Sequence, residues 1–330
     1  MLDIILIFVI VFAFLFEFIN GFHDTANAIA TSVYTKALTP GRAIMLAAVM
    51  NFLGALVSER VASTISKNLV SVQLAQYVIL AALIGAIIWN LLTWWRGIPS
   101  SSSHALIGSL IGATLVYTSS VGSIKVEGVL EKVVIPLFLS PVVGLVVGYT
   151  IMVLIRKLCA HWSQSRVNKT FLKLQIFSAA LVAYSHGNND AQKTMGIITL
   201  ALISGGMLGA EAGVPLWVKI TCATTMAIGT SIGGWKIMKT MGSKVTKLEP
   251  ASGFSAQTSA AIVIEAASFI GAPISTTQVI TASVMGAGSA KRTSAVKWGL
   301  AGDIAKAWIL TLPVSMLLGA AACWIIGLFV

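Results

Sequence analysis

The sequence predicts an all-α integral membrane protein of about ten spans, arranged as two inverted-topology repeats with broken or re-entrant helices at the midplane. Three observations support this prediction. Of the 330 residues, 57% are hydrophobic and only 10% are charged. Apolar runs of about 20 residues, the length that crosses a bilayer, recur from end to end, which no water-soluble core requires. Finally, two polar motifs each occur once in each half of the chain, in the same order.

The apolar runs divide the chain into two halves of five expected spans. The spans cover residues 3–34, 41–58, 77–95, 98–118, 133–155, 174–204, 216–235, 255–271, 273–290 and 298–328. Residues 1–155 are expected to form the first repeat, 156–173 a basic cytoplasmic linker, and 174–330 the second repeat. Because each half holds an odd number of spans, the second half enters the membrane the other way up, as in secondary transporters.

The distribution of charge predicts the orientation. The 22 Lys and Arg exceed the 11 Asp and Glu by 11, a balance that in a water-soluble protein would suggest nucleic-acid binding. Here the cations lie between apolar runs, where such loops face the cytoplasm, so no nucleic-acid partner is expected. With the basic segment 156–173 inside, both termini lie outside, and we expect a multi-pass protein of the cell inner (plasma) membrane.

The first motif pair puts ionisable groups inside apolar segments. Residues 20–28 read Asn-Gly-Phe-His-Asp-Thr-Ala-Asn-Ala, and residues 184–194 read Tyr-Ser-His-Gly-Asn-Asn-Asp-Ala-Gln-Lys-Thr. We expect the helices to break near the glycines, which would place Asp24 and Asp190 at a central binding site. The alternative is a structural acid satisfied by neighbouring hydroxyls. Because a carboxylate in lipid costs a few kcal/mol, a functional role is favoured.

The second motif pair opens the fourth and ninth expected spans. Residues 97–105 read Gly-Ile-Pro-Ser-Ser-Ser-Ser-His-Ala, and residues 271–279 read Gly-Ala-Pro-Ile-Ser-Thr-Thr-Gln-Val. Proline starts or kinks a helix, and hydroxyl residues after it add donors where the helix dipole is positive. Such a helix start can cradle an oxyanion. An N-cap or a flexible linker is the alternative, which two copies in opposed orientations make less favourable.

These four stretches resemble the signatures of the PiT family of inorganic phosphate transporters, and the resemblance covers nearly the whole chain. It implies secondary transport of inorganic phosphate driven by a cation gradient, with no enzymatic activity, cofactor or bound metal. It also implies that hydroxyl residues hold phosphate, namely Ser101, Ser102, Ser103, Ser275, Thr276 and Thr277. Asp24, Asn27, Asn189 and Asp190 would serve the coupling cation.

The departures from the family pattern concern the driving ion. His23 replaces the first amide that sodium-coupled members carry, and Lys193 stands where the second repeat would have its final Asn. Both are therefore assigned to ion coupling. Four further residues are expected to support the site from behind, namely His104, Gln278, Gln257 and Asn51. The residues at these positions resemble those of the bacterial proton-coupled branch of the family, which is associated with carriage of metal-phosphate complexes.

Lys193 favours protons over sodium. It lies three residues after Asp190, where helical side chains meet, so its ammonium would take the electrostatic role of a bound cation. Its alternative is to snorkel to the membrane interface. His23 or Asp24 would then carry the proton. A sodium-coupled symporter and a permease for sulfate or another oxyanion stay open, as do a channel, a membrane-embedded hydrolase and a homo-oligomeric assembly.

Overall fold

The chain folds into a bundle of long helices. The structure, a computed structural model, describes residues 4–232 and 246–330, apart from the side chains of residues 25–27. The described α-helices are α1 Ile4–Tyr34, α2 Pro40–Ala55, α3 Arg60–Lys67, α4 Gln76–Arg96, α5 Ser102–Thr118, α6 Val126–Val129, α7 Ile135–Leu158, α8 Gln164–Ser204, α9 Leu216–Ile232, α11 Pro250–Phe269, α12 Thr276–Ser289 and α13 Trp298–Gly327. A π-helical turn, Leu130–Val134, joins α6 to α7. No strand occurs in these two described ranges, so the all-α prediction is confirmed.

Each of the ten expected spans corresponds to helical structure, but the helices differ in length. Among the described residues, four helical stretches are long and apolar enough to cross a membrane, and α2 with α3, bent by 64°, makes a fifth. By contrast, α5 has 17 residues and α12 has 14. They rise about 25 Å and 21 Å, less than the roughly 30 Å of a hydrocarbon core. Both follow an extended segment, as a re-entrant helix would.

The expected helix breaks at the glycines of the first motif pair are wrong. The backbones of α1 and α8 are helical throughout, including Gly21 and Gly187. These glycines instead allow neighbouring helices to approach closely. A Cβ on Gly21 would lie 2.6 Å from the carbonyl oxygen of Met226, and one on Gly187 would lie 2.2 Å from that of Asn51. The chain breaks instead at the second motif pair, before α5 and α12.

The segment expected as a linker, residues 156–173, is mostly helical. α7 continues to Leu158 and α8 begins at Gln164, so only residues 159–163 lie outside helices. Ser163 caps α8 by accepting a hydrogen bond from the backbone N–H of Arg166. The sequence indicated a gap because polar residues end the apolar run, but the start of α8 keeps an apolar contact through Phe171, which is buried against Phe254.

The helix contacts have the reciprocity that an inverted repeat would produce. α1 packs on α9 and α8 packs on α2, so the motif helix of each half contacts a helix of the other half. Likewise, α5 packs on α13 and α12 packs on α7. Each short helix also pairs with the helix before it, α4 with α5 and α11 with α12. The two halves are thus interlocked rather than placed side by side.

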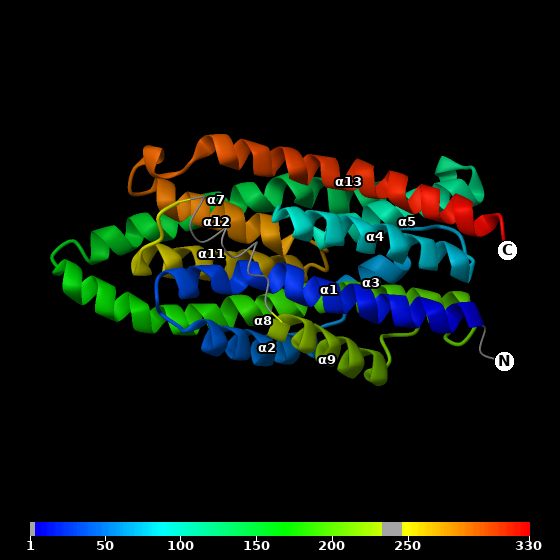
Figure 1. Cartoon of the computed structure of the whole chain (residues 1–330), viewed down its shortest axis with the longest axis horizontal. Helices are drawn as coiled ribbons and strands as arrows, with labels where there is room; N and C mark the ends of the chain where they lie inside the picture. Colours follow the sequence, from blue (N-terminus) through cyan, green and yellow to red (C-terminus); the bar gives the residue numbers. More distant parts are fainter. Residues whose placement is uncertain (1–3, 233–245) are drawn as a thin grey trace.

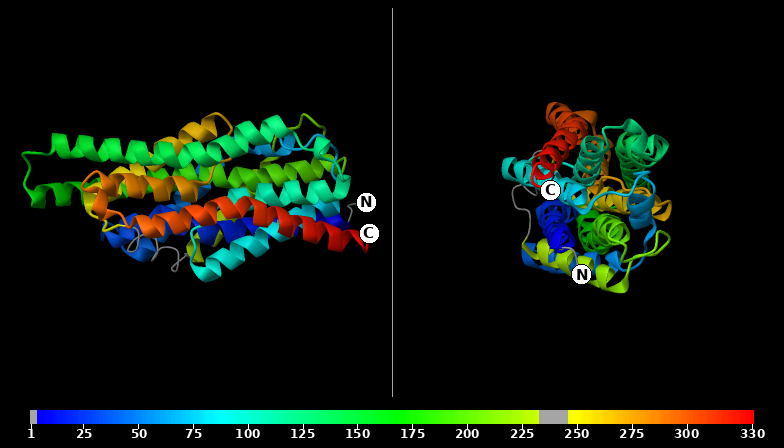
Figure 2. Two further views of the ribbon diagram at one scale, coloured as in Figure 1. Left: turned by 90° about the horizontal axis from the view of Figure 1, so that it is seen from above. Right: turned by 90° about the vertical axis from the view of Figure 1, so that its right-hand side faces the viewer.

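The ends of the bundle agree with the expected order of loops. The start of α1 and the end of α13 lie at one end of the long axis, and the turn between α7 and α8 lies at the other (Figure 1). The view along this axis in Figure 2 shows the helices running roughly parallel to it. α5 lies toward the end with the termini and α12 toward the opposite end (Figure 1). The lysines at 236, 239 and 244, part of the predicted inner charge, lie outside the described residues.

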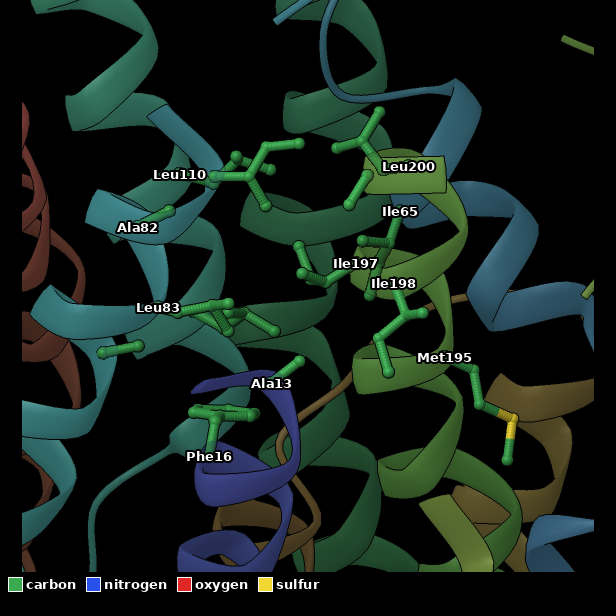
Figure 3. Packing of buried hydrophobic residues seen from close by; sticks show 14 of the residues in the cluster. Ala13, Phe16, Ile65, Ala82, Leu83, Leu110, Met195, Ile197, Ile198 and Leu200 are labelled. Atoms are coloured by element: carbon green, nitrogen blue, oxygen red, sulfur yellow. The ribbon is translucent and has the colours of Figure 1, made fainter. Parts of the chain in front are cut away.

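The molecule is apolar on its outside and polar in its centre. Val142 on α7 is 58% exposed and Leu317 on α13 is 70% exposed, as expected for helices that face lipid. An apolar cluster around Phe16, Leu83 and Ile197 packs α1, α4 and α8 together (Figure 3). The motif residues Asp24, His23, Asp190 and Lys193 are buried, although burying charge is costly unless it is paired. The structure therefore concentrates its buried charge at one place.

Candidate functional site

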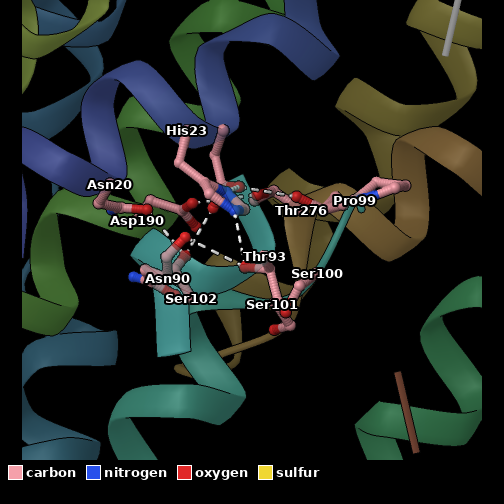
Figure 4. A network of polar contacts seen from close by, with 12 residues as sticks. Asn20, His23, Asn90, Thr93, Pro99, Ser100, Ser101, Ser102, Asp190 and Thr276 are labelled. Atoms are coloured by element: carbon pink, nitrogen blue, oxygen red, sulfur yellow. Dashed lines mark hydrogen bonds and ion pairs between the residues drawn. The ribbon is translucent and has the colours of Figure 1, made fainter. Parts of the chain in front are cut away.

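Asp24 lies near the middle of the bundle, where both short helices begin. Its Oδ2 accepts a hydrogen bond of 2.5 Å from the hydroxyl of Ser102, the first residue of α5. Its Oδ1 accepts one of 3.0 Å from the hydroxyl of Thr277 on α12. The starts of α5 and α12 therefore meet at one carboxylate of α1. Figure 4 shows this network, with Ser102 and Thr276 approaching the motif residues of α1 and α8.

Asp190 is the corresponding carboxylate of α8. Its Oδ2 accepts a hydrogen bond of 3.0 Å from the Thr276 hydroxyl, and its Oδ1 accepts one from the Lys193 ammonium. The Nε2 of His186 lies 3.2 Å from Oδ2, close enough for an ion pair when the imidazole is protonated but without hydrogen-bond geometry. Each motif aspartate thus contacts a histidine and at least one hydroxyl of a helix start.

Lys193 occupies the space between the two helix starts. Its ammonium donates to Asp190, to the Ser103 hydroxyl and, at 2.9 Å, to the carbonyl oxygen of Ile274. The residue is only 1% exposed. This burial excludes the alternative in which Lys193 snorkels to the membrane interface. One ammonium therefore links a carboxylate of α8 to the starts of both α5 and α12.

Two of the six hydroxyl residues assigned to phosphate act as N-caps in this structure. The Ser101 Oγ accepts from the backbone N–H of His104 at 3.2 Å, and the Ser275 Oγ accepts from that of Gln278 at 3.3 Å. The N-cap alternative therefore applies to this matched pair. Because a cap satisfies only one donor, the first N–H groups of α5, on Ser102 and Ser103, have no acceptor within the helix. They are the donors an oxyanion would meet.

The remaining residues assigned to ion coupling occupy different places. The Nδ1 of His23 lies 2.6 Å from Asp24 Oδ1, and its Nε2 lies 3.3 Å from the Thr93 hydroxyl. Asn189 instead donates to the Ser268 hydroxyl at 2.9 Å and to the Ala272 carbonyl at 3.2 Å. It therefore holds the segment before α12 rather than an aspartate. The side chain of Asn27 lies outside the described part of the chain.

The four supporting residues form two matched pairs. Asn51 donates to the Thr230 hydroxyl at 3.0 Å, and its Oδ1 lies 3.1 Å from the Nδ1 of His186. Gln257 donates to the Ser32 hydroxyl at 2.7 Å and accepts from Ser178. Asn51 thus reaches Asp190 through one imidazole.

The second pair, His104 and Gln278, follows the helix starts. The Nδ1 of His104 lies 2.7 Å from the Ser101 hydroxyl. Its Nε2 has no partner among the described residues, and neither does the side-chain amide of Gln278. Both residues are fully buried. Each therefore has hydrogen-bonding capacity that this conformation leaves unused.

Sequence reasoning missed three residues that the structure places in the network. His186 precedes Asp190 by four positions, a spacing that brings side chains together on a helix and was visible in the motif. Asn20 accepts a hydrogen bond of 2.8 Å from Ser102. Thr93 carried no signal, because its contact with His23 spans 70 positions of an apolar helix pair. Such a contact follows only from the tertiary arrangement.

The network has the atoms to hold a cation. Asp24, His186 and Asp190 each present one ligand atom, and these atoms lie within 4.8 Å of one another. Carboxylate oxygens suit sodium and hard divalent ions. Both carboxylates already accept hydrogen bonds, and Asp190 also binds the Lys193 ammonium. A metal ion would therefore compete with a cation that the chain itself supplies.

The strand-free bundle with a lipid-facing outside and a buried charged centre is that of a polytopic membrane transport protein. A family model described as "Phosphate transporter family" matches residues 20–165 and 159–319. The chain belongs to this family, whose members are transporters and not enzymes. The predicted family is therefore confirmed.

Curated relatives and a solved structure agree with this assignment. A "Probable low-affinity inorganic phosphate transporter" of Bacillus subtilis is 47% identical over 331 residues, covering 99% of both chains. A protein of the same name from Rhizobium meliloti is 48% identical over 303 residues, covering 91% of this chain and 90% of its own. The solved structure titled "The sodium-dependent phosphate transporter" is 25% identical, has a TM-score of 0.85, and covers 99% of this chain and 100% of its own.

Proposed function

We propose that this chain carries inorganic phosphate into the cell across the inner (plasma) membrane as a cation-coupled symporter, with the proton as the coupling ion. The observation that supports it most is the meeting of two oppositely directed helix starts at Asp24 and Asp190, with Lys193 buried between them. The two halves would act as inverted repeats, residues 1–155 and 174–330, about this centre. Both termini would face outside.

Phosphate fits the proposed centre better than sulfate does. At neutral pH phosphate keeps a proton and donates a hydrogen bond to a carboxylate, whereas sulfate would face that acceptor with no proton. In the present conformation the hydroxyls of Ser102, Thr276 and Thr277 donate to the aspartates. A rotation of these hydroxyls toward an anion would exchange one acceptor for another. The Lys193 ammonium lies where it would balance the charge of that anion.

The balance of charge supports a coupling cation. Asp24, Asp190 and Lys193 together carry one net negative charge before the imidazoles are counted. The buried Glu17 carboxyl, which accepts a hydrogen bond from Thr194, adds a further negative charge when it is ionised. An added phosphate anion makes this charge more negative, and an uncompensated buried charge is costly. His23 and His186 lie against the two carboxylates, and an imidazole becomes a cation when it takes up a proton. Protons on these imidazoles would supply the missing positive charge.

Sodium coupling is the main alternative, and a structural relative is titled sodium-dependent. The difference we propose lies at Asp190, where Lys193 takes the place that an ion would need. At Asp24, the described hydrogen-bonding partners of the carboxylate are the hydroxyls of Ser102 and Thr277 and the imidazole of His23, so no ammonium takes the place of an ion there. Carriage of phosphate together with a divalent metal is a second candidate, favoured by the spacing of Asp24, His186 and Asp190. In that case the metal ion would be transported together with phosphate as part of the substrate.

Reconstituted transport tests the proposal. The purified protein in proteoliposomes is expected to accumulate labelled phosphate above its outside concentration, with saturation, when an ion gradient is imposed. Unlabelled arsenate should compete, and equimolar sulfate should not. Phosphate flux that only follows its own gradient would instead support a channel, and competition by sulfate as strong as by arsenate would support a general oxyanion permease.

A further inference from the structure

A small polar cavity lies beside the central site, where the bend between α2 and α3 meets α8 and the end of α11. Its volume is about 280 Å³, and its polar lining residues are Ser58, Arg60, Asn188, Glu265 and Ser268. Asn188 belongs to the motif of α8 and precedes Asp190 by two positions. The cavity therefore borders the same stretch of α8 as the proposed phosphate site, from the side that Asn188 faces, since two positions along a helix turn a side chain by about 200°. α3, which supplies Arg60, lies on the side of the molecule's middle toward the chain termini (Figure 1).

Arg60 brings a guanidinium to this cavity that forms no salt bridge with Glu265, the carboxylate that also lines it. Its Nη1 donates to the carbonyl oxygen of Phe269 at 2.5 Å, and its guanidinium lies 4.4 Å from the centre of the Phe269 ring. In the described part of the chain Arg60 forms no salt bridge, whereas Lys67 of the same helix pairs with Glu211. A guanidinium has five N–H donors in a planar fork that matches an oxyanion. Arg60 can therefore bind an anion without breaking an ion pair.

Glu265 adds an acceptor that suits a protonated anion. It is half-buried, and its Oε2 accepts a hydrogen bond of 3.1 Å from the Asn188 amide. Its Oε1 is buried and has no partner among the residues that the structure describes. A phosphate that keeps a proton can donate to this oxygen while its other oxygens face Arg60. Sulfate has no proton to donate and would be repelled by the carboxylate.

In the first repeat, aromatic residues occupy the positions that correspond to the cavity residues Asn188 and Ser268. Phe22 precedes Asp24 by two positions, as Asn188 precedes Asp190, and Trp94 precedes Pro99 by five, as Ser268 precedes Pro273. The rings of Phe22 and Trp94 meet edge to face with centroids 5.3 Å apart. The two matched places are therefore unlike: Asn188 and Ser268 line a cavity, whereas the rings of Phe22 and Trp94 contact each other. This asymmetry points to a route for a polar solute on the Arg60 side.

Arg60 also holds the segment that leads into α12. Three side chains donate to carbonyls within four residues of this segment: Arg60 to Phe269, Thr64 to Gly271 at 2.7 Å, and Asn189 to Ala272 at 3.2 Å. Any movement of the segment away from α3 breaks these contacts and releases the guanidinium. An anion in the cavity would offer the guanidinium a stronger acceptor than a carbonyl does.

We propose that this cavity is an entry site for phosphate, which binds there before it reaches the central site, and that Arg60 exchanges the Phe269 carbonyl for the anion. The inference rests on the proposed phosphate transport and on the termini facing outside. It assigns capture to Arg60 and discrimination against unprotonated anions to Glu265. Neither residue contacts the two motif aspartates.

Uptake by intact cells tests the entry site. We expect Arg60→Gln to raise the KM for external phosphate about three- to tenfold with Vmax per transporter unchanged, because a charge at the rim of a site acts mainly on capture. Lys67→Gln, which removes one positive charge from the same helix outside the cavity, is the matched control and should leave KM unchanged. Arg60→Lys, which keeps the charge, should fall between wild type and Arg60→Gln. Uptake rates are divided by the amount of transporter at the cell surface. Melting temperatures of the purified variants show whether each variant is folded.

The outcomes separate the entry site from the proposed function. An equal KM in Arg60→Gln and Lys67→Gln would overturn the entry site. A lower Vmax of Arg60→Gln with unchanged KM would also overturn it, because Arg60 would then be only a structural contact. Glu265→Gln should strengthen inhibition of uptake by sulfate several-fold relative to wild type, and unchanged inhibition contradicts its assigned role. Absence of phosphate uptake by wild type would instead refute the proposed function itself.

Discussion

The buried pair of Lys193 and Asp190 gives the sharpest prediction, because removing one partner leaves the other charge uncompensated. Replacing Lys193 by Met removes an ammonium that is 1% exposed and has three acceptors, Asp190, Ser103 and the Ile274 carbonyl. Breaking a buried pair in this way costs about 3–5 kcal/mol. We expect that loss in the free energy of unfolding measured in mixed lipid–detergent micelles, together with loss of phosphate uptake.

A double variant and a control make this test specific. Asp190→Asn combined with Lys193→Met removes both charges, so it should recover most of the lost stability while uptake stays absent. Lys219→Met breaks a pair with Glu59 whose side chains are 19% and 39% exposed. Such a pair contributes at most about 1 kcal/mol. Equal destabilisation by Lys193→Met and Lys219→Met, or a double variant no more stable than the single one, would refute the reasoning.

Three further predictions concern binding, packing and topology. Ser102→Ala should raise the KM for phosphate at least several-fold, since a lost hydrogen bond to a charged group costs about 1.5–3 kcal/mol, and an unchanged KM would argue against the cradle. Gly187→Ala should lower the melting temperature, because its Cβ meets backbone at 2.2 Å, whereas Gly41→Ala, with nothing within 4 Å, should not. Cysteines replacing Gly122 and Gln164 should react with impermeant reagents from opposite sides of the membrane, and same-side labelling would refute the predicted topology.

The sequence was sufficient for the fold class because membrane helices need long apolar runs. It also placed Asp24 and Asp190 correctly in the buried centre, since repeated ionisable residues in such runs are rare. It placed the breaks at Gly21 and Gly187 wrongly, although the helix starts after Pro99 and Pro273 lie where it expected them. A glycine in an apolar run can mark a helix break or a close contact between two helices. For Gly21 and Gly187 it marks a close contact, and this depends on a neighbouring helix that lies far away in the sequence.

The sequence also did not predict which hydroxyl residues of the Ser/Thr stretches cap a helix and which contact the motif helices. Six hydroxyl residues look alike in a row, but the first of each triplet, Ser101 and Ser275, caps its helix while the others reach the motif helices. Which hydroxyl does which depends on where each helix begins. The contact of His23 with Thr93 depends likewise on how α1 packs against α4.

The coupling ion is the centre of the account, and one measurement addresses it directly. Purified protein is reconstituted into sodium-free proteoliposomes, and labelled phosphate uptake is followed after an inward-directed proton gradient is imposed. The account predicts accumulation that rises with the gradient, collapses when a protonophore is added, and is not increased by sodium. Uptake that requires sodium and does not respond to the proton gradient would contradict the account and would make Asp24 a sodium ligand.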